Sequence, residues 1–132
     1  MSVMPIAVAL LRDQEGRVFL VRKRATAAFM QPGGKIEAGE GALATLQREL
    51  REELELELDE SAFTFLGRAE APAANEPNTT VEAAIFAVTT AAPLAVRAEL
   101  EEGRWVSPAD ALTLTLAPLT RDHVIPLAAR LS

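Results

Sequence analysis

Three glutamates in one predicted helix constrain this chain more than any other feature of its sequence. Glu49, Glu52 and Glu53 stand at positions i, i+3 and i+4, which places them on one face of a helix. The helix itself, residues 41–54, is predicted by a stripe of leucines at helical spacing: Leu43, Leu46, Leu50 and Leu54. Carboxylates this close repel one another, so either solvent surrounds them or a divalent cation offsets their charge.

The composition restricts the kind of cation that can bind. The chain has no cysteine and one histidine, His123, which excludes disulfides, thiolate sites and histidine-rich zinc sites. Oxygen ligands remain, and these suit Mg²⁺, Mn²⁺ or Ca²⁺.

Size and charge narrow the class of protein. A chain of 132 residues, 49% of them hydrophobic, has the size of one domain, so we expect a single domain over residues 1–132. The net charge of −6 argues against binding to a nucleic-acid polymer. No apolar run approaches the roughly 18 residues of a membrane span, and no secretion signal is evident. We therefore expect no membrane partner and a cytoplasmic location, as a monomer or a homodimer.

Strands and further helices are predicted on both sides of the acidic helix. Predicted strands cover residues 3–12, 17–24, 62–70, 79–90 and 104–106. Turns, breaks or loops separate them at residues 13–16, 31–34, 71–78 and 98–103. A brief helix from residue 107 and a C-terminal helix over 117–131 complete the prediction. This mixture of strands and helices indicates the α/β class.

The order of residues from Gly34 to Leu56 is specific. Gly34 is followed after five residues by Glu40 and, after seven more, by Arg48-Glu49-Leu50-Arg51-Glu52-Glu53-Leu54-Glu55-Leu56. This order resembles the Nudix box, G-x5-E-x7-R-E-U-x-E-E-x-G-U with U aliphatic, and only Glu55 departs from it. The preceding Pro32-Gly33-Gly34-Lys35-Ile36-Glu37 resembles the PGGKxE lead-in of MutT-like members. The resemblance implies a Nudix fold over nearly the whole chain, an α/β/α sandwich around a mixed β-sheet.

The resemblance also implies an activity. Nudix hydrolases cleave nucleoside diphosphates linked to another moiety, using Mg²⁺ or Mn²⁺ and water. We therefore expect a pyrophosphohydrolase that acts on a nucleotide-type small molecule, a nucleoside triphosphate or an ADP-ribose-like compound. Two alternatives stay open: a Nudix-fold module that binds a nucleotide without hydrolysis, and an unrelated α/β interaction domain with a solvated acidic helix.

Roles follow from positions in the box. Glu49, Glu52 and Glu53 would hold the metal ions, with one of them or a neighbouring glutamate as the base. The backbone carbonyl of Gly33 resembles a further ligand of the family. Arg48 would orient a carboxylate of the box by ion pairing.

Further candidates lie outside the helix. Glu40 would support the junction between the loop and the helix. Many members of the family recruit another acid from a later loop, and Glu99 or Glu102 would supply it here, although an exposed acidic turn is the simpler interpretation. A basic group is expected to contact phosphate: Arg22, Lys23, Arg24 and Lys35.

Glu55 is the one position where the box is broken. A Gly at a helix end permits a left-handed backbone, and Glu in the same conformation would cost about 1 kcal/mol. We expect altered local geometry at Glu55 and a retained metal site.

Overall fold

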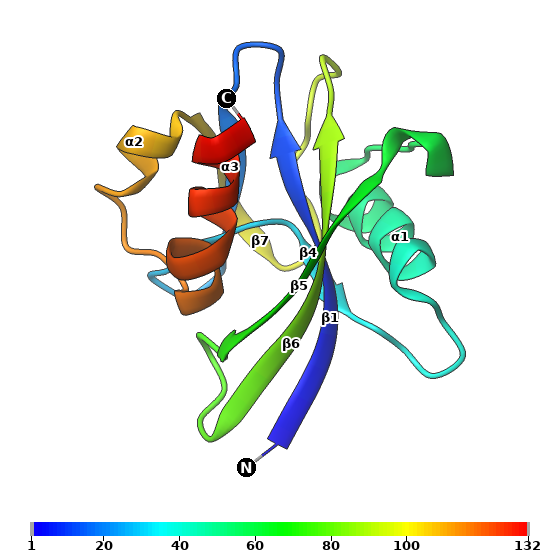
Figure 1. Cartoon of the computed structure of the whole chain (residues 1–132), viewed down its shortest axis with the longest axis vertical. Helices are drawn as coiled ribbons and strands as arrows, with labels where there is room; N and C mark the ends of the chain where they lie inside the picture. Colours follow the sequence, from blue (N-terminus) through cyan, green and yellow to red (C-terminus); the bar gives the residue numbers. More distant parts are fainter. Residues whose placement is uncertain (1, 132) are drawn as a thin grey trace.

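The computed structural model describes residues 2–131 and places one mixed sheet between helices (Figure 1). Its strands are β1 (Ser2–Arg12), β2 (Val18–Lys23), β3 (Phe29–Met30), β4 (Gly33–Lys35), β5 (Thr64–Pro72), β6 (Thr79–Thr89) and β7 (Leu100–Val106). Its helical segments are α1 (Ala42–Leu54), the 3₁₀ turn η1 (Glu60–Ala62), α2 (Pro108–Ala111), the π-helical η2 (Thr120–Val124) and α3 (Ile125–Leu131). Helix α1 covers one face of the sheet, and α2 with α3 covers the other. The expected α/β/α arrangement is confirmed.

Strand β1 organises the sheet. Along one edge it runs parallel to β6, in register from Ser2↔Thr79 to Arg12↔Thr89. Its other edge is shared, because its middle residues, Ile6 to Val8, pair with β4 and its last residue pairs with β2. The short pairing with β4 brings the backbone of Gly33 directly beside Val8. The glycines that open the predicted acidic segment are thereby fixed to the centre of the sheet.

Alternation along β1 supplies a core on each face. Val8 and Leu10 pack toward α2 and α3, whereas the small Ala7 and Ala9 lie under α1. The helix contributes three fully buried leucines to this second cluster: Leu46, Leu50 and Leu54. The leucine stripe is therefore buried against the sheet, as its spacing predicts, and this burial determines which side of α1 the glutamates occupy.

Some element boundaries differ from the predictions. The residues predicted as an acidic turn, 98–103, are largely strand, because β7 begins at Leu100 and pairs with β2. The predicted break at 31–34 includes strand β4, whose pairing with β1 is a long-range contact. Strand β5 ends at Pro72, two residues later than predicted. The C-terminal helix is helical as predicted, but η2 interrupts its α-helical hydrogen bonding.

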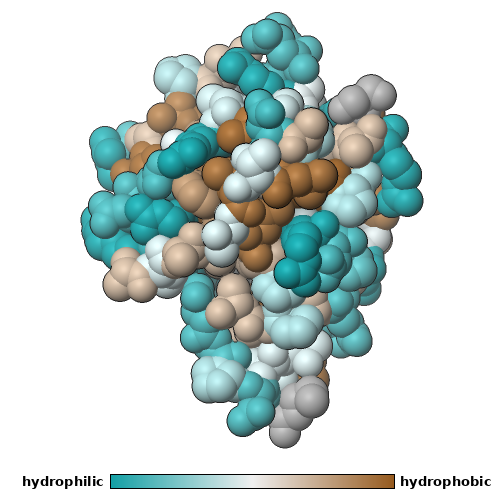
Figure 2. All heavy atoms as spheres, turned by 90° about the vertical axis from the view of Figure 1, so that its left-hand side faces the viewer, coloured by the Kyte–Doolittle hydropathy of each residue, from teal (hydrophilic) through white to brown (hydrophobic). Residues whose placement is uncertain are grey.

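The face that carries α2 and α3 has an apolar patch near its centre, bordered by hydrophilic side chains (Figure 2). Leu112 and Leu131 are exposed large hydrophobic side chains of this half of the chain. No helix within residues 2–131 is long and apolar enough to cross a membrane.

Candidate active site

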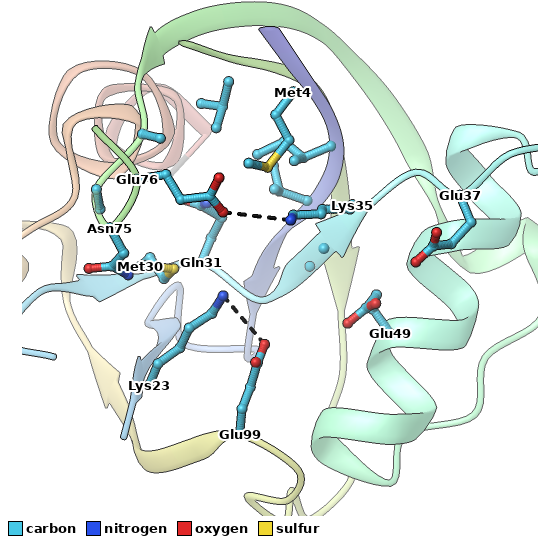
Figure 3. Close-up of a pocket in the computed structure, with 17 residues that line it drawn as sticks. Met4, Lys23, Met30, Gln31, Lys35, Glu37, Glu49, Asn75, Glu76 and Glu99 are labelled. Carbon is cyan, nitrogen blue, oxygen red and sulfur yellow. Dashed lines mark ion pairs between the residues drawn. The ribbon is translucent and has the colours of Figure 1, made fainter. Parts of the chain in front are cut away.

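A cavity of about 450 Å³ opens where β1 and β4 meet the loop after β5 (Figure 3). Its apolar lining comes mainly from the sheet: Met4, Ile6, Val8, Met30 and Val81. Its charged lining comes from several elements: Lys23, Lys35, Glu37, Glu49, Glu76 and Glu99. The pocket thus combines an apolar side with a rim that holds both carboxylates and ammonium groups.

Glu53 is the most deeply placed acid near this pocket. Its residue is 3% exposed, and the backbone N–H of Gly33 donates to its Oε1 over 3.4 Å. Burial, followed by the charges of Glu49 and Glu99, raises the pKa of Glu53 to about 8. The Gly33 N–H and the charge of Lys23 lower this pKa, but burial outweighs them.

Glu49 lines the pocket itself and depends on a glycine. A Cβ on Gly34 would lie 2.5 Å from Cδ of Glu49, so only glycine leaves room for this carboxylate. Burial raises the pKa of Glu49, while its contact with Arg48 works in the opposite direction. The second half of the Gly33-Gly34 pair therefore serves the site by having no side chain.

Arg48 donates hydrogen bonds to three acids of the box. Its Nε and Nη2 donate to both oxygens of Glu40 at 2.8 and 2.9 Å, and its Nη1 donates to Glu49 at 2.8 Å and to Glu52 at 2.9 Å. The hydrogen bonds from Arg48 lower the pKa of Glu40 to about 2. Glu40 also accepts from the Thr45 hydroxyl and from the Glu37 N–H, so it joins the loop to α1.

The predicted metal ligands do not all share one place. Glu49 and Glu99 line the pocket and Glu53 lies beside it, whereas the Glu52 side chain is 51% exposed and directed to Arg48. Within residues 2–131, no three acidic or histidine side chains are close enough together to hold one ion.

The chemistry of the donors nevertheless fits a hard divalent cation. The available ligands are carboxylate oxygens of Glu49 and Glu53 and the carbonyl of Gly33, all of the type that Mg²⁺ and Mn²⁺ prefer. The buried charge of Glu53 and the space left by Gly34 are the structural features that such an ion would use.

Two of the four predicted basic residues reach the pocket. The ammonium of Lys23 pairs with Glu99 at 3.3 Å, and that of Lys35 pairs with Glu76 at 3.6 Å (Figure 3). The other two do not line it: the Arg22 guanidinium donates to the Thr26 carbonyl.

Arg24 and Glu102 are also engaged elsewhere. Arg24 donates to the Ala98 carbonyl, and Glu102 lies between Arg22 and Arg104, at 3.3 and 2.7 Å. Of the two acids proposed from the later segment, only Glu99 lines the pocket.

Glu55 keeps the left-handed backbone that a glycine would adopt. Its φ is 54° and its ψ is 35°, and its N–H donates to the Arg51 carbonyl at the end of α1. The altered local geometry expected at Glu55 is therefore wrong: the helix end keeps the left-handed shape with Glu in place of Gly, at the conformational cost of a non-glycine residue.

Two amide side chains of the pocket had no counterpart in the sequence predictions. Gln31 is 7% exposed, and its Oε1 accepts from the Thr120 hydroxyl at 2.7 Å. Asn75 lines the pocket from the loop after β5. In the sequence, Gln31 is marked only by its position before the Pro-Gly-Gly segment, and Asn75 only by its position in a polar loop.

Comparison with known proteins agrees with this fold. A family model described as the NUDIX domain matches residues 3–128. The MutT protein of Methanosarcina mazei Go1 has 20% sequence identity and a TM-score of 0.80, with 98% of this chain and 94% of that chain covered. The E. coli dihydroneopterin triphosphate pyrophosphohydrolase has 16% identity and a TM-score of 0.80, with 98% and 99% covered.

A third similar structure is the NUDIX domain of Shewanella oneidensis NrtR complexed with ADP ribose, at 17% identity and a TM-score of 0.79, with 100% and 90% covered. No protein of curated function matches the chain. The family match, together with MutT-type hydrolases among the structural neighbours, supports a pyrophosphohydrolase. Because the NUDIX model matches residues 3–128, this chain belongs to the Nudix family.

Proposed function

We propose that this protein hydrolyses a pyrophosphate bond in a nucleoside diphosphate derivative, with Mg²⁺ or Mn²⁺ bound beside α1. The observation that carries the proposal is the arrangement of charge around one pocket. Glu49 and Glu99 line it beside the buried Glu53, and the ammonium groups of Lys23 and Lys35 line the same cavity. A polyanionic substrate needs both kinds of group, one to hold cations and one to contact phosphate oxygens directly.

The side chains would divide the work as follows. Glu49 and Glu53, with the Gly33 carbonyl, would hold the cation, and Glu52 would join them after leaving its contact with Arg48. When bound, a divalent cation neutralises phosphate charge and lowers the pKa of a coordinated water. Arg48 keeps the Glu49 carboxylate in place through its hydrogen bond.

Proton transfer needs a carboxylate of suitable pKa. A bound cation favours the ionised form of its ligand, so the pKa of about 8 that burial gives Glu53 applies only while no ion is bound to it. Glu53 and Glu49 are the two candidates for the base, and the one that keeps an oxygen free of the cation would accept the proton. Glu99 is the candidate for a further ligand, for which it would have to exchange its partner Lys23.

The substrate class is narrowed by the pocket and by the relatives. A cavity of about 450 Å³ is of the size that holds a small-molecule ligand. Gln31 and Asn75 offer amide groups to the edge of a base or to ribose hydroxyls. Structural relatives are described with ADP ribose, as an Ap4A hydrolase and as a dihydroneopterin triphosphate pyrophosphohydrolase. We therefore propose a nucleoside triphosphate or an ADP-ribose-like compound, used in the cytoplasm by a monomer or a homodimer.

A substrate screen tests the proposal. Wild-type protein is incubated with nucleoside triphosphates, ADP-ribose and dinucleoside polyphosphates, each with Mg²⁺, with Mn²⁺ and with EDTA. We expect metal-dependent release of a phosphate-containing product from at least one compound, and none in EDTA. A folded protein that turns over nothing and binds no Mn²⁺ would refute the proposal.

One observation favours a second function, a module that binds a nucleotide without hydrolysing it. Arg48 already engages both Glu49 and Glu52, so these acids are not gathered for an ion. The same screen distinguishes the two functions. A rise in Tm with a nucleotide, without product under any metal condition, would support the binding module.

A further inference from the structure

The residue that breaks the Nudix box has a specific partner. The Oε2 of Glu55, at the left-handed end of α1, lies 2.6 Å from Nε of Arg97 in the segment between β6 and β7. A glycine at this position would take the same backbone shape with less strain but would leave Arg97 without this contact. The departure from the box thus adds a connection that the usual residue cannot make.

The backbone around Arg97 is fastened to the same end of the helix. The N–H of Ala95 donates to the Leu54 carbonyl at 3.2 Å, and the N–H of Arg97 donates to the Glu53 carbonyl at 2.8 Å. The backbone of Arg97 therefore contacts Glu53 on the last turn of α1, and its side chain contacts Glu55 directly after the helix end. The segment is fixed to the helix that carries the catalytic candidates.

The chain then turns sharply toward the pocket. Ala98 has a φ of 57°, a left-handed conformation that alanine rarely adopts. Its carbonyl accepts from the Arg24 side chain at 2.9 Å, and the Glu99 carbonyl accepts from the Arg24 N–H at 3.0 Å. This turn leaves the Glu99 side chain in the pocket, paired with Lys23 (Figure 3).

We propose that Glu55 and Arg97 act as positioning residues, which set the place of Glu99 relative to the carboxylates of α1. The proposal rests on the proposed function for its effect on hydrolysis. Both partners involve a left-handed non-glycine residue, since Glu55 has this backbone itself and Ala98 follows Arg97 directly, and such strain is typical of segments held for function. The role is one of geometry, because an exposed ion pair contributes little to stability.

The variant Glu55→Gly distinguishes an effect on the position of Glu99 from an effect on the stability of the protein. The substitution restores the residue of the box and relieves the left-handed strain, so Tm should stay equal or rise. If the pair positions Glu99, kcat should nevertheless fall about two- to fivefold with KM nearly unchanged, the range set by the loss of one exposed ion pair. Arg97→Gln should lower kcat by a similar factor, and the double variant should fall no further. Glu57→Gln, an exposed glutamate two residues away, is the matched control.

A second readout does not depend on activity. Amide hydrogen exchange, measured by NMR on metal-free protein, should accelerate about two- to fivefold at Ala95, Arg97 and Leu100 in both single variants. The charge swap Glu55→Arg with Arg97→Glu should restore part of the protection. Exchange in the centre of β6 serves as the internal reference.

The outcomes separate the two proposals. If wild type hydrolyses no substrate, the proposed function fails, while the exchange rates still decide whether the pair holds the segment. Unchanged exchange in Glu55→Gly and Arg97→Gln would overturn the inference. In an active enzyme, faster exchange with an unchanged kcat would overturn it as well, because the pair would then be structural only.

Discussion

Two neighbouring regions of this protein treat negative charge in opposite ways. In the first of these regions, Arg48 on α1 donates hydrogen bonds to three carboxylates and lowers the pKa of Glu40 to about 2. At the pocket, less than two turns along the same helix, burial raises the pKa of Glu53 to about 8. In one region a cation of the chain donates hydrogen bonds to the acids, and in the other burial outweighs the charge of the nearby Lys23.

The difference indicates where an external cation belongs. Unpaired buried charge is costly, so a folded protein that retains it has a use for it or binds a compensating ion. The acids at Arg48 need no ion, whereas Glu53 and the pocket side of Glu49 do. Glu49 belongs to both regions and links them, since it contacts Arg48 and lines the pocket.

Removing the buried charge should produce the largest effect. Glu53→Gln keeps the shape of the side chain but removes its charge, its metal affinity and its ability to accept a proton. We expect kcat to fall by about 10²- to 10⁴-fold, the usual contribution of such a group. Steady-state kinetics with the substrate found in the screen measures the change. Glu57→Gln, also a loss of one glutamate charge, should stay near wild type, and a similar loss in both variants would contradict the comparison.

Stability of the metal-free protein should fall as pH rises. The folded-state pKa of Glu53, about 8, is above its ordinary value of 4.5, so between these pH values the folded state holds a proton that the unfolded state has lost. Its contribution is most favourable below pH 4.5 and is lost as pH rises through 8, on the order of a few kcal/mol in the free energy of unfolding.

Urea denaturation of metal-free protein at pH 5, 7 and 9 measures this dependence. Glu53→Gln should flatten the fall between pH 5 and 9 and make the variant more stable than wild type at pH 9. Added Mg²⁺ should raise the free energy of unfolding of wild type at pH 9 and should leave that of Glu53→Gln unchanged. If the free energy of unfolding depends on pH in the same way in wild type and variant, Glu53 is not held protonated in the folded protein.

Filling the space beside Glu49 should disturb the pocket without disturbing the core. In Gly34→Ala, the new Cβ would meet the Glu49 carboxylate, which must leave its place. We expect kcat to fall at least about tenfold, which corresponds to roughly 1.4 kcal/mol, with Tm little changed. Gly41→Ala is the control, because nothing lies near the position of its new Cβ. Equal kinetics in the two alanine variants would mean that the place of Glu49 does not matter.

Breaking the compensated region should give the smallest effect. Arg48→Gln removes the cation that lowers the pKa of Glu40, so Tm should fall by several degrees at pH 7. A lowered folded-state pKa stabilises above pH 4.5, and that advantage disappears as pH falls through about 2, so the Tm difference should shrink in acid. Thermal scans at pH 7 and pH 3 check this against Arg51→Gln, an exposed arginine on the same helix. If the Tm difference between wild type and Arg48→Gln does not change with pH, Arg48 is not what lowers the pKa of Glu40.

Local periodicity predicted the parts of the fold that are set by local sequence. The leucine stripe gave α1 to within one residue, and the strands predicted at 3–12 and 79–90 match β1 and β6 to within one residue. Strand β4 and the first half of β7 were missed because their strand state comes from partners far away in the sequence, β1 and β2. The π-helical turns of η2 have no counterpart in a simple 3.6-residue pattern.

The site was predictable where a motif specified it and not elsewhere. The spacing of the box selected Glu49 and Glu53, but it could not show that Arg48 takes Glu52 away from the pocket. Glu99 and Glu102 were equivalent in sequence, and only strand pairing separated them, by placing Glu102 between two arginines. Gln31 depends on Thr120, which is 89 residues away in the chain.

The central claim is that Glu53 holds a proton until a divalent cation replaces it. Calorimetric titration of metal-free protein with Mn²⁺ at pH 7, in two buffers of different ionisation enthalpy, counts the protons released on binding. Because the pKa of Glu53 is about 8, we predict the release of close to one proton per bound ion in wild type and none in Glu53→Gln. Binding without proton release, or with the same release in the variant, would contradict the account.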